Sequence, residues 1–207
     1  MQLRRSDILK ASPPMFESRA LDRLTRVHPI VPPLIFIPAI AVTFALGQEE
    51  IAPLPVIAWL LGGYAIWSLT EYWMHRVIFH FEPEDGIGAR LHWMIHGVHH
   101  DHPNDPMRLV MPPSVSVPLA LGFYALFHVI FGAQHADLVA CGFLAGYLVY
   151  DMTHYYLHHR QARTRLGKLF YELHMRHHFQ DHTRGFGVSV PYWDYAFRTG
   201  ARRKRPD

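Results

Sequence analysis

The stretch ADLVACGFLAGYLVYDMTHYYLHH, residues 136–159, carries two signals in one segment. Its first part, Ala136–Thr153, is mostly apolar and close to the length of about 20 residues that a membrane-spanning helix needs. His154 and His158 follow directly, and residues four apart lie on the same face of a helix. The segment therefore predicts a spanning helix that continues past its apolar part with two imidazoles side by side.

Three further apolar segments precede this one along the chain. They are Ile30–Leu46, Ile51–Thr70 and Ser114–Gly132. Half of the 207 residues are hydrophobic and only 18% are charged, which argues against disorder and is below the quarter usual in soluble domains. Four such helices in the core of a soluble protein would leave too little polar surface for so short a chain. Pro32, Pro33 and Pro38 predict that the first helix starts late or is kinked.

The basic residues predict how these segments face the membrane. Lysines and arginines precede the first segment, separate the second from the third and follow the fourth, whereas the short turns 47–50 and 133–135 have none. Because basic residues accumulate on the cytoplasmic side, we expect both termini and the long middle loop in the cytoplasm, below the inner membrane if the protein is bacterial. The run ARRKR, residues 201–205, is either a solvated tail or a contact with anionic lipid.

Most of the 17 histidines gather in four groups, at the expected cytoplasmic ends of these segments or in the expected cytoplasmic stretches of the chain. The groups are His75/His80, His96/His99/His100, His154/His158 and His174/His177/His178. Neutral imidazole is a good ligand for zinc, iron, copper and nickel. Without a metal, several clustered imidazoles would repel when protonated or leave buried nitrogens unpaired. The single Cys141 excludes a disulfide within the chain and a cysteine-based metal site.

The spacing within the groups indicates a dinuclear site. In HxxHH the first histidine lies near both later ones on a helix, while the adjacent pair diverges, so one unit can serve two neighbouring metals. His75 and His80 are five apart, about 140° around an α-helix, and meet at one ion only if the helix end loosens or the ion lies across its tip. Spacing alone leaves His92, His102, His159 and His182 open as further contributors.

The fold prediction combines these features. We expect one all-α domain over residues 1–207, an integral membrane four-helix transmembrane bundle with a cytoplasmic helical cap that carries the dinuclear histidine site. A cytoplasmic segment, 1–28, precedes the bundle, and a basic tail, 199–207, ends the chain. Lone histidines such as His28, His128 and His135 are expected to be structural.

Several motifs resemble the fatty acid hydroxylase superfamily of histidine-rich membrane diiron oxygenases, and most of all its fatty acid 2-hydroxylases. The matching text includes WSLTEY at 67–72, RLVMPP at 108–113, YDMTHYYLHH at 150–159 and GFGVS with WDYAF between 185 and 197. The histidine groups alone are shared with sterol desaturases and carotenoid hydroxylases, so the RLVMPP and GFG…WDYAF text is the more specific part. The resemblance covers the chain from about Trp67 onward.

The resemblance implies a ligand set for each of two iron ions, which zinc can replace in a purified sample, with O₂ as co-substrate. One metal is implied on His75, His80, His96, His100 and His177. The other is implied on His99, His154, His158, His174 and His178. Asp151, one turn before Tyr155, is a candidate to hydrogen-bond a ligand imidazole, as carboxylates beside metal sites often do.

The implied function is hydroxylation of a lipid acyl chain at C2, in a free fatty acid, an acyl thioester or a ceramide-like lipid. Many eukaryotic relatives carry a fused cytochrome b5 domain with an HPGG motif, which this sequence lacks. We therefore expect a separate electron donor, such as a ferredoxin or cytochrome b5 with its reductase, and no nucleic acid partner. Candidates to line the substrate entry are Met74, Phe79, Trp93, Met94, Met107, Tyr150, Tyr155 and Tyr156.

Two alternatives compete with C2 hydroxylation. One is hydroxylation of another lipid, such as a carotenoid, a sterol or a lipid head group. The other is a membrane protein that binds or transports metal, although transport favours ionisable residues at mid-membrane rather than clusters on one side. A zinc hydrolase would keep a carboxylate base beside the metal, and no HExxH motif is present.

Overall fold

The computed structural model describes residues 4–49 and 51–201, and these contain helices and no strand. Four long helices are α3 (Val31–Gly47), α4 (Pro53–Trp73), α7 (Pro113–Phe131) and α8 (Ala133–His159). Shorter helices are α1 (Arg5–Leu9), α2 (Arg19–Leu24), α5 (Gly86–His92), α6 (Val98–Asp101), α9 (Arg165–Phe179) and α10 (Tyr192–Ala196). Two π-helical turns, η1 (Met74–Phe79) and η2 (Trp93–Gly97), follow α4 and α5 directly.

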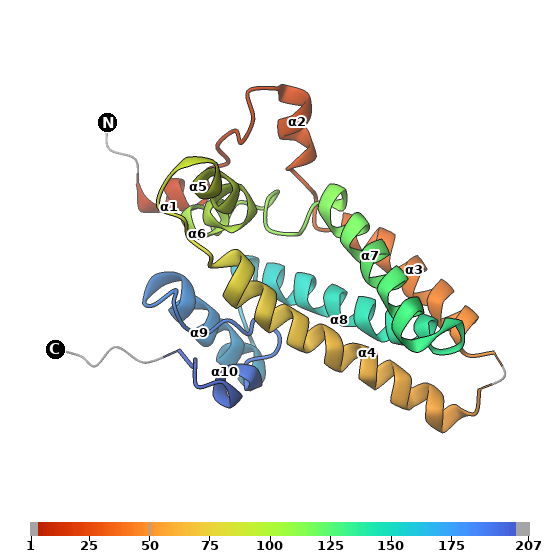
Figure 1. The fold of residues 1–207 in the computed structure, drawn as a ribbon. Helices are drawn as coiled ribbons and strands as arrows, with labels where there is room; N and C mark the ends of the chain where they lie inside the picture. The colour runs from red at the N-terminus through yellow and green to blue at the C-terminus, as the bar shows by residue number, and fades with distance from the viewer. Residues whose placement is uncertain (1–3, 50, 202–207) are drawn as a thin grey trace.

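The long helix α8 is the centre of the bundle. It packs against α3, α4 and α7, and it lies alongside α4 for most of its length (Figure 1). Most residues of its bundle portion are buried, and Phe143 and Tyr147 join Phe36, Trp67 and Phe127 in the apolar core. An α-helix of this length extends about 40 Å at 1.5 Å per residue, so α8 reaches beyond the apolar layer.

Close contact between α4 and α8 depends on two glycines. A Cβ atom on Gly142 would overlap the carbonyl oxygen of Leu60, and one on Gly63 would overlap the carbonyl oxygen of Val139. Small residues let two helix backbones approach closely, as in many membrane proteins. The glycines therefore set how closely α4 and α8 pack within the apolar core.

Each apolar segment expected from the sequence is a helix, but they differ in how well they suit a membrane. Among the described residues, Pro53–Phe79 and Pro113–Phe131 are long and apolar enough to cross a bilayer. Helix α3 is apolar and shorter, and α8 is buried by its neighbours. Pro32 and Pro33 lie in the first turn of α3 and Pro38 within it. The number of crossings stays a prediction, while the all-helical architecture is confirmed.

The remaining helices gather at one end of the bundle (Figure 1). We call this end, residues 74–112 and 154–201, the cap, and we call α3, α4, α7 and residues 133–153 the bundle. Helices α1 and α10, near the two ends of the described chain, both lie at the cap end (Figure 1). The cap contains every histidine of the four sequence groups.

Candidate metal centre

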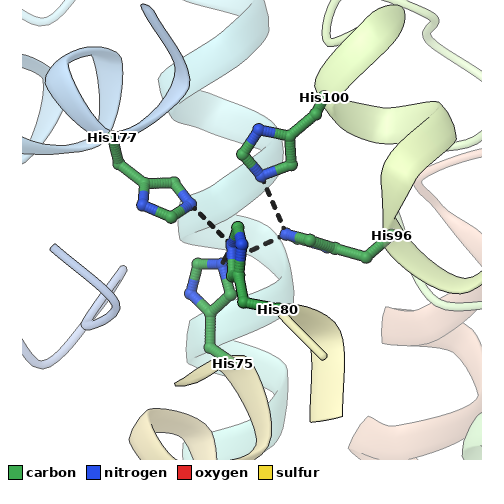
Figure 2. Close-up of side chains that lie close together, drawn as sticks. All are labelled: His75, His80, His96, His100 and His177. Atoms are coloured by element: carbon green, nitrogen blue, oxygen red, sulfur yellow. Dashed lines mark hydrogen bonds between the residues drawn. The ribbon is translucent and has the colours of Figure 1, made fainter. Parts of the chain in front are cut away.

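Five histidines from three separate segments converge in the first cluster. Each ring contributes one nitrogen, and these nitrogens all lie within 4.8 Å of one another. The rings point toward a common centre (Figure 2). Typical Nε2–Nε2 distances are 3.2 Å from His75 to His96 and 3.0 Å from His80 to His177. The members of this first cluster are His75, His80, His96, His100 and His177.

The second cluster lies beside the first and is built in the same way. Its five ring nitrogens also lie within 4.8 Å of one another. The Nε2 atoms of His99 and His154 are 2.9 Å apart, and those of His158 and His174 are 2.8 Å apart. The rings of His100 and His178, one from each cluster, stack at a centroid distance of 4.3 Å. The members of this second cluster are His99, His154, His158, His174 and His178.

The adjacent histidine pairs divide between the clusters as the HxxHH spacing predicts. His99 joins the second cluster and His100 the first, and His177 and His178 divide in the same way. Helix geometry causes this, because neighbouring side chains leave a helix in directions about 100° apart. The two membership lists coincide with the sets that the family resemblance implied.

A π turn brings His75 and His80, which are five residues apart, into the same cluster. The backbone N–H of His80 donates to the carbonyl oxygen of His75 at 3.2 Å, which closes the wider turn of η1. The two Nε2 atoms are then 3.3 Å apart. The second π turn, η2, ends one residue after His96. Such turns are rare and occur often at functional sites.

The hydrogen bonds of the first cluster fit a bound cation. The Nδ1 atoms of His75 and His177 lie 2.5 and 2.8 Å from carbonyl oxygens, so each Nδ1 must carry the proton and donate it. A neutral imidazole has one proton, so both Nε2 atoms present lone pairs to the centre. Lone pairs that face each other within about 3 Å are stabilised by a metal ion, and an all-imidazole set suits a divalent transition metal.

Burial keeps the clustered histidines neutral and ready to bind metal. Desolvation lowers the pKa of His80 to about 4 and that of His177 to about 3, and neighbouring imidazoles add to the effect. The pKa values of His96, His99 and His174 are lowered well below the usual value for the same reasons. Neutral rings at neutral pH are the form that coordinates a metal.

The four histidines that spacing left open lie outside both clusters. His102 donates from Nδ1 to the carbonyl oxygen of Ile8 at 2.6 Å, which ties α1 to the cap. His182 lies 3.6 Å from a carboxylate oxygen of Glu82. The rings of His92 and His159 are partly buried, and their Nε2 atoms have no hydrogen-bond partner among the described residues.

Asp151 is buried next to the second cluster, yet its hydrogen bonds go elsewhere. Its carboxylate accepts from the backbone N–H of Met111 at 3.2 Å and from the hydroxyl of Tyr147 at 3.4 Å. These bonds fix the segment that enters α7 against α8. The proposed bond from Asp151 to a ligand imidazole is not among its contacts, so that role stays a prediction.

An apolar cavity of about 390 Å³ reaches the metal centre. His96 from the first cluster and His99 and His154 from the second form part of its wall. The rest is mainly hydrophobic and comes from the segment 15–25, η1, η2 and the start of α7. Of the entry candidates, Met74, Phe79, Met94 and Tyr150 line this cavity, whereas Trp93, Met107, Tyr155 and Tyr156 do not.

Comparison with known proteins identifies the family. The chain matches the fatty acid hydroxylase family over residues 59–199. It is 34% identical to a dihydroceramide fatty acyl 2-hydroxylase of Arabidopsis thaliana over 188 residues, 90% of this chain and 79% of that protein.

This chain belongs to the fatty acid hydroxylase family.

Two further relatives extend the comparison within this family. The human fatty acid 2-hydroxylase is 42% identical over 143 residues, which are 66% of this chain and 38% of that protein. A solved structure of full-length Scs7p, in which only the hydroxylase domain is visible, aligns with a TM-score of 0.88 at 32% identity, over 95% of this chain and 75% of that one. Family membership makes the chain an oxidoreductase that acts on lipid in a membrane context, and the ten clustered histidines are its candidate metal site.

Sequence reasoning missed two groups of residues that shape this site. The first is the segment 15–25, which forms one side of the cavity and is held by an ion pair of 2.8 Å between Asp22 and Arg108. The second is the pair of buried acids Glu71 and Asp194. Glu71 had a detectable signal, because a carboxylate beside an apolar segment needs hydrogen-bond donors.

Proposed function

We propose that this protein is a diiron, O₂-dependent 2-hydroxylase of fatty acyl chains. One iron would be held by His75, His80, His96, His100 and His177, and the other by His99, His154, His158, His174 and His178. The observation that carries the proposal is the contact between the apolar cavity and both clusters through His96, His99 and His154. A cavity of a few hundred Å³ is typical of small-molecule sites.

The residues that line the cavity explain how an unreactive C–H bond would be held next to the metal centre. When bound, the irons would supply the redox chemistry for activating O₂, which acids and bases of side chains do not provide. Met74, Met94 and Leu119 line the cavity with apolar surface, which holds an acyl chain and excludes water. Phe79 stacks on His96 at 5.1 Å and keeps that ring against the cavity wall. Positioning of this kind decides which carbon reacts.

The position of the cavity supports reaction near the head-group end of a lipid. The clusters lie at one end of the bundle, and the cavity extends from them to Val115 and Leu119 on α7. A chain that enters from the bilayer would place its polar end nearest the cap and its tail along α7. The substrate is then a free fatty acid, an acyl thioester or a ceramide-like lipid, and relatives named as ceramide and fatty acid hydroxylases support this range.

The same proposal includes the topology and the electron source. Residues 1–207 form one domain that crosses the membrane several times, with 1–28, the cap, the basic tail 199–207 and both termini in the cytoplasm. The positive residues at the cap end and the apolar helices α4 and α7 support this orientation. Electrons would come from a separate donor, such as a ferredoxin or cytochrome b5 with its reductase.

A role in metal transport is the main proposal of another class. It would need polar ligands along the bundle, between the cap and the far end. In the described bundle the buried acid farthest from the cap is Asp137, which binds Tyr124 at 2.6 Å. The ten histidines are instead at one end, beside a closed apolar core. This arrangement favours catalysis over transport.

Lipid analysis tests the proposed reaction. The protein is expressed with the reductants of its host, and its lipids are compared by mass spectrometry with those of cells that express His158→Ala. We expect one added oxygen atom on the acyl fragment that contains C2, and none with the variant. Oxygen on a head-group fragment, a sterol or a carotenoid ring would reject C2 chemistry, and metal uptake into proteoliposomes that depends on His158 would support transport instead.

A further inference from the structure

The loop from Arg184 to Ser189 touches the first cluster from outside. The carbonyl oxygen of Phe186 accepts the Nδ1 hydrogen bond of His75 at 2.5 Å, and that of Arg184 accepts from His177 at 2.8 Å. These bonds fix both the proton position and the rotation of each ring. Backbone carbonyls that bind the outer nitrogen of a histidine orient its inner nitrogen toward a metal.

Two buried carboxylates hold this loop in place. Asp194 accepts from the backbone N–H groups of Phe186 and Gly187 at 2.9 and 2.7 Å. Glu71 accepts from the backbone N–H groups of Val188 and Ser189 at 3.0 and 2.8 Å, and from the Ser189 hydroxyl at 2.5 Å. Each acid is only 3% exposed. The two carboxyl groups hold four consecutive backbone N–H groups, so the loop carbonyls have little freedom to move.

The hydroxyl groups around Asp194 extend this network to α4. Thr199 donates to Asp194 at 2.8 Å, and its oxygen lies 2.8 Å from the hydroxyl of Tyr72. Gly185 has a φ of +79°, a conformation that other residues adopt only under strain, and it starts the turn that presents the Phe186 carbonyl. The loop is thus anchored at both ends to the helix that carries His75.

The second cluster lacks such support. Among the described residues, no protein group hydrogen-bonds the outer nitrogen of any of its five histidines. The Nδ1 atoms of His174 and His178 are buried and have no partner there. In the first cluster, by contrast, His75, His80 and His177 all have one.

We propose that Glu71 and Asp194 are positioning residues that make the first cluster the tighter of two unequal metal sites. The carboxylates act through the carbonyls of Phe186 and Arg184, which orient His75 and His177. The second cluster, whose outer nitrogens have no hydrogen-bond partner among the described residues, is the exchangeable site and fills last. This inference rests on the two-metal site of the proposed function.

Equilibrium competition with a coloured chelator tests the order. Purified protein is loaded with zinc, and the zinc released is measured against chelator concentration. We expect two steps of one ion each, with midpoints separated by about 10- to 100-fold, the usual effect of partners around metal ligands. His178→Ala should remove the weaker step and leave the tighter one, which assigns the steps to the clusters.

The positioning role predicts a selective change. In Asp194→Asn, an NH₂ group or a weaker acceptor faces the N–H groups of Phe186 and Gly187. The chelator concentration at the midpoint of the tighter step should therefore fall about 10-fold, toward that of the weaker step. The midpoint of the weaker step should not change. Ser189→Ala removes one hydrogen bond to Glu71 and should shift the same step less, in a variant that keeps the buried acid. Asp137→Asn, a buried acid in the bundle, is the matched control and should shift neither step.

The outcomes separate this inference from the function. Binding of fewer than two zinc ions per chain would contradict the two-metal site itself. Two ions released in one step, or an Asp194→Asn variant that shifts both steps equally, would overturn the unequal sites and leave the proposed function standing. Thermal unfolding of each zinc-loaded variant shows whether the whole protein has been destabilised. If general destabilisation weakened zinc binding, the Asp137→Asn variant would release zinc at lower chelator concentrations as well, which would contradict a specific role of Asp194.

Discussion

The bundle and the cap are held together by different forces. The bundle is stabilised by apolar packing, close helix contacts at Gly63 and Gly142, and aromatic edges such as Trp67 on Phe143 at 5.2 Å. The cap depends on polar contacts, with buried carboxylates that bind backbone N–H groups and ten imidazoles that face one another. Apolar packing needs no ligand, whereas converging lone pairs do. The bundle should therefore tolerate metal removal, and the cap should not.

The largest effect is expected from loss of a cap ligand. His158→Ala removes a nitrogen of the second cluster, so zinc or iron content should fall from two ions per chain to about one, and hydroxylase activity should fall more than 100-fold. Metal analysis and product formation measure this. His128→Ala, on α7 within the bundle, is the matched control and should keep both ions. If His158→Ala kept its full metal content, the second cluster would not be a metal site.

Acid should weaken the cap of the metal-free protein. An unfolded histidine binds its proton near pH 6.5, whereas burial lowers the pKa of folded His80 to about 4. Between these values the unfolded chain binds more protons, so the free energy of unfolding decreases as pH falls, by up to about 1.4 kcal/mol per pH unit for one such group.

Thermal unfolding of metal-free protein between pH 7 and 4 measures this slope. The zinc-loaded protein should unfold at a higher temperature at pH 7 and lose that advantage as acid displaces the metal. A metal-free protein whose stability stays constant over this range would show that the histidines are not buried in the neutral form.

Filling the cavity between the cap and the bundle should reduce substrate turnover without removing metal. Leu119→Trp adds bulk to the cavity wall on α7, so turnover of a long acyl substrate should fall about 10-fold while both metal ions remain. Leu121→Trp, two residues along the same helix, does not face the cavity and serves as the control. Unchanged turnover in Leu119→Trp would place the substrate elsewhere.

The smallest effect on metal content is expected from a change in the bundle, because Gly142 lies about three helical turns before His154 on α8. Gly142→Ala forces a Cβ atom against the Leu60 carbonyl, so the free energy of unfolding should decrease by about 1–3 kcal/mol. Gly62→Ala is the matched control, because nothing lies within 4 Å of the added atom, and it should be neutral or slightly stabilising. Calorimetry and metal analysis of the two variants distinguish bundle from cap.

The sequence predicted the helices and the histidine groups because both have periodic signals. Residues four apart share a helix face, which predicted that His154 and His158 lie side by side. The five-residue interval of His75 and His80 left two possibilities, a loosened helix end or an ion across the helix tip, and the π turn η1 corresponds to the first. These interpretations used only the local geometry of one helix at a time.

What the sequence could not predict depends on contacts between distant segments. The carbonyl oxygens of Phe186 and Arg184 that bind His75 and His177 are backbone atoms and have no sequence signature. The segment 15–25 reaches the cavity because Asp22 pairs with Arg108, and one acid–base pair among many gives no signal of its own. Topology relative to a bilayer depends on the surrounding lipid, and its prediction rests on the distribution of basic residues.

The wide turn η1 makes chain length between His75 and His80 matter more than side-chain identity. Val77 and Ile78 are about half exposed, so substitutions there leave the backbone register intact. Inserting one residue would rotate His80 by about 100° away from its neighbours, whereas deleting one would leave an ordinary α turn with the two histidines four apart on one face. A gene for this protein should therefore accept point mutations in this interval far more readily than single-codon insertions.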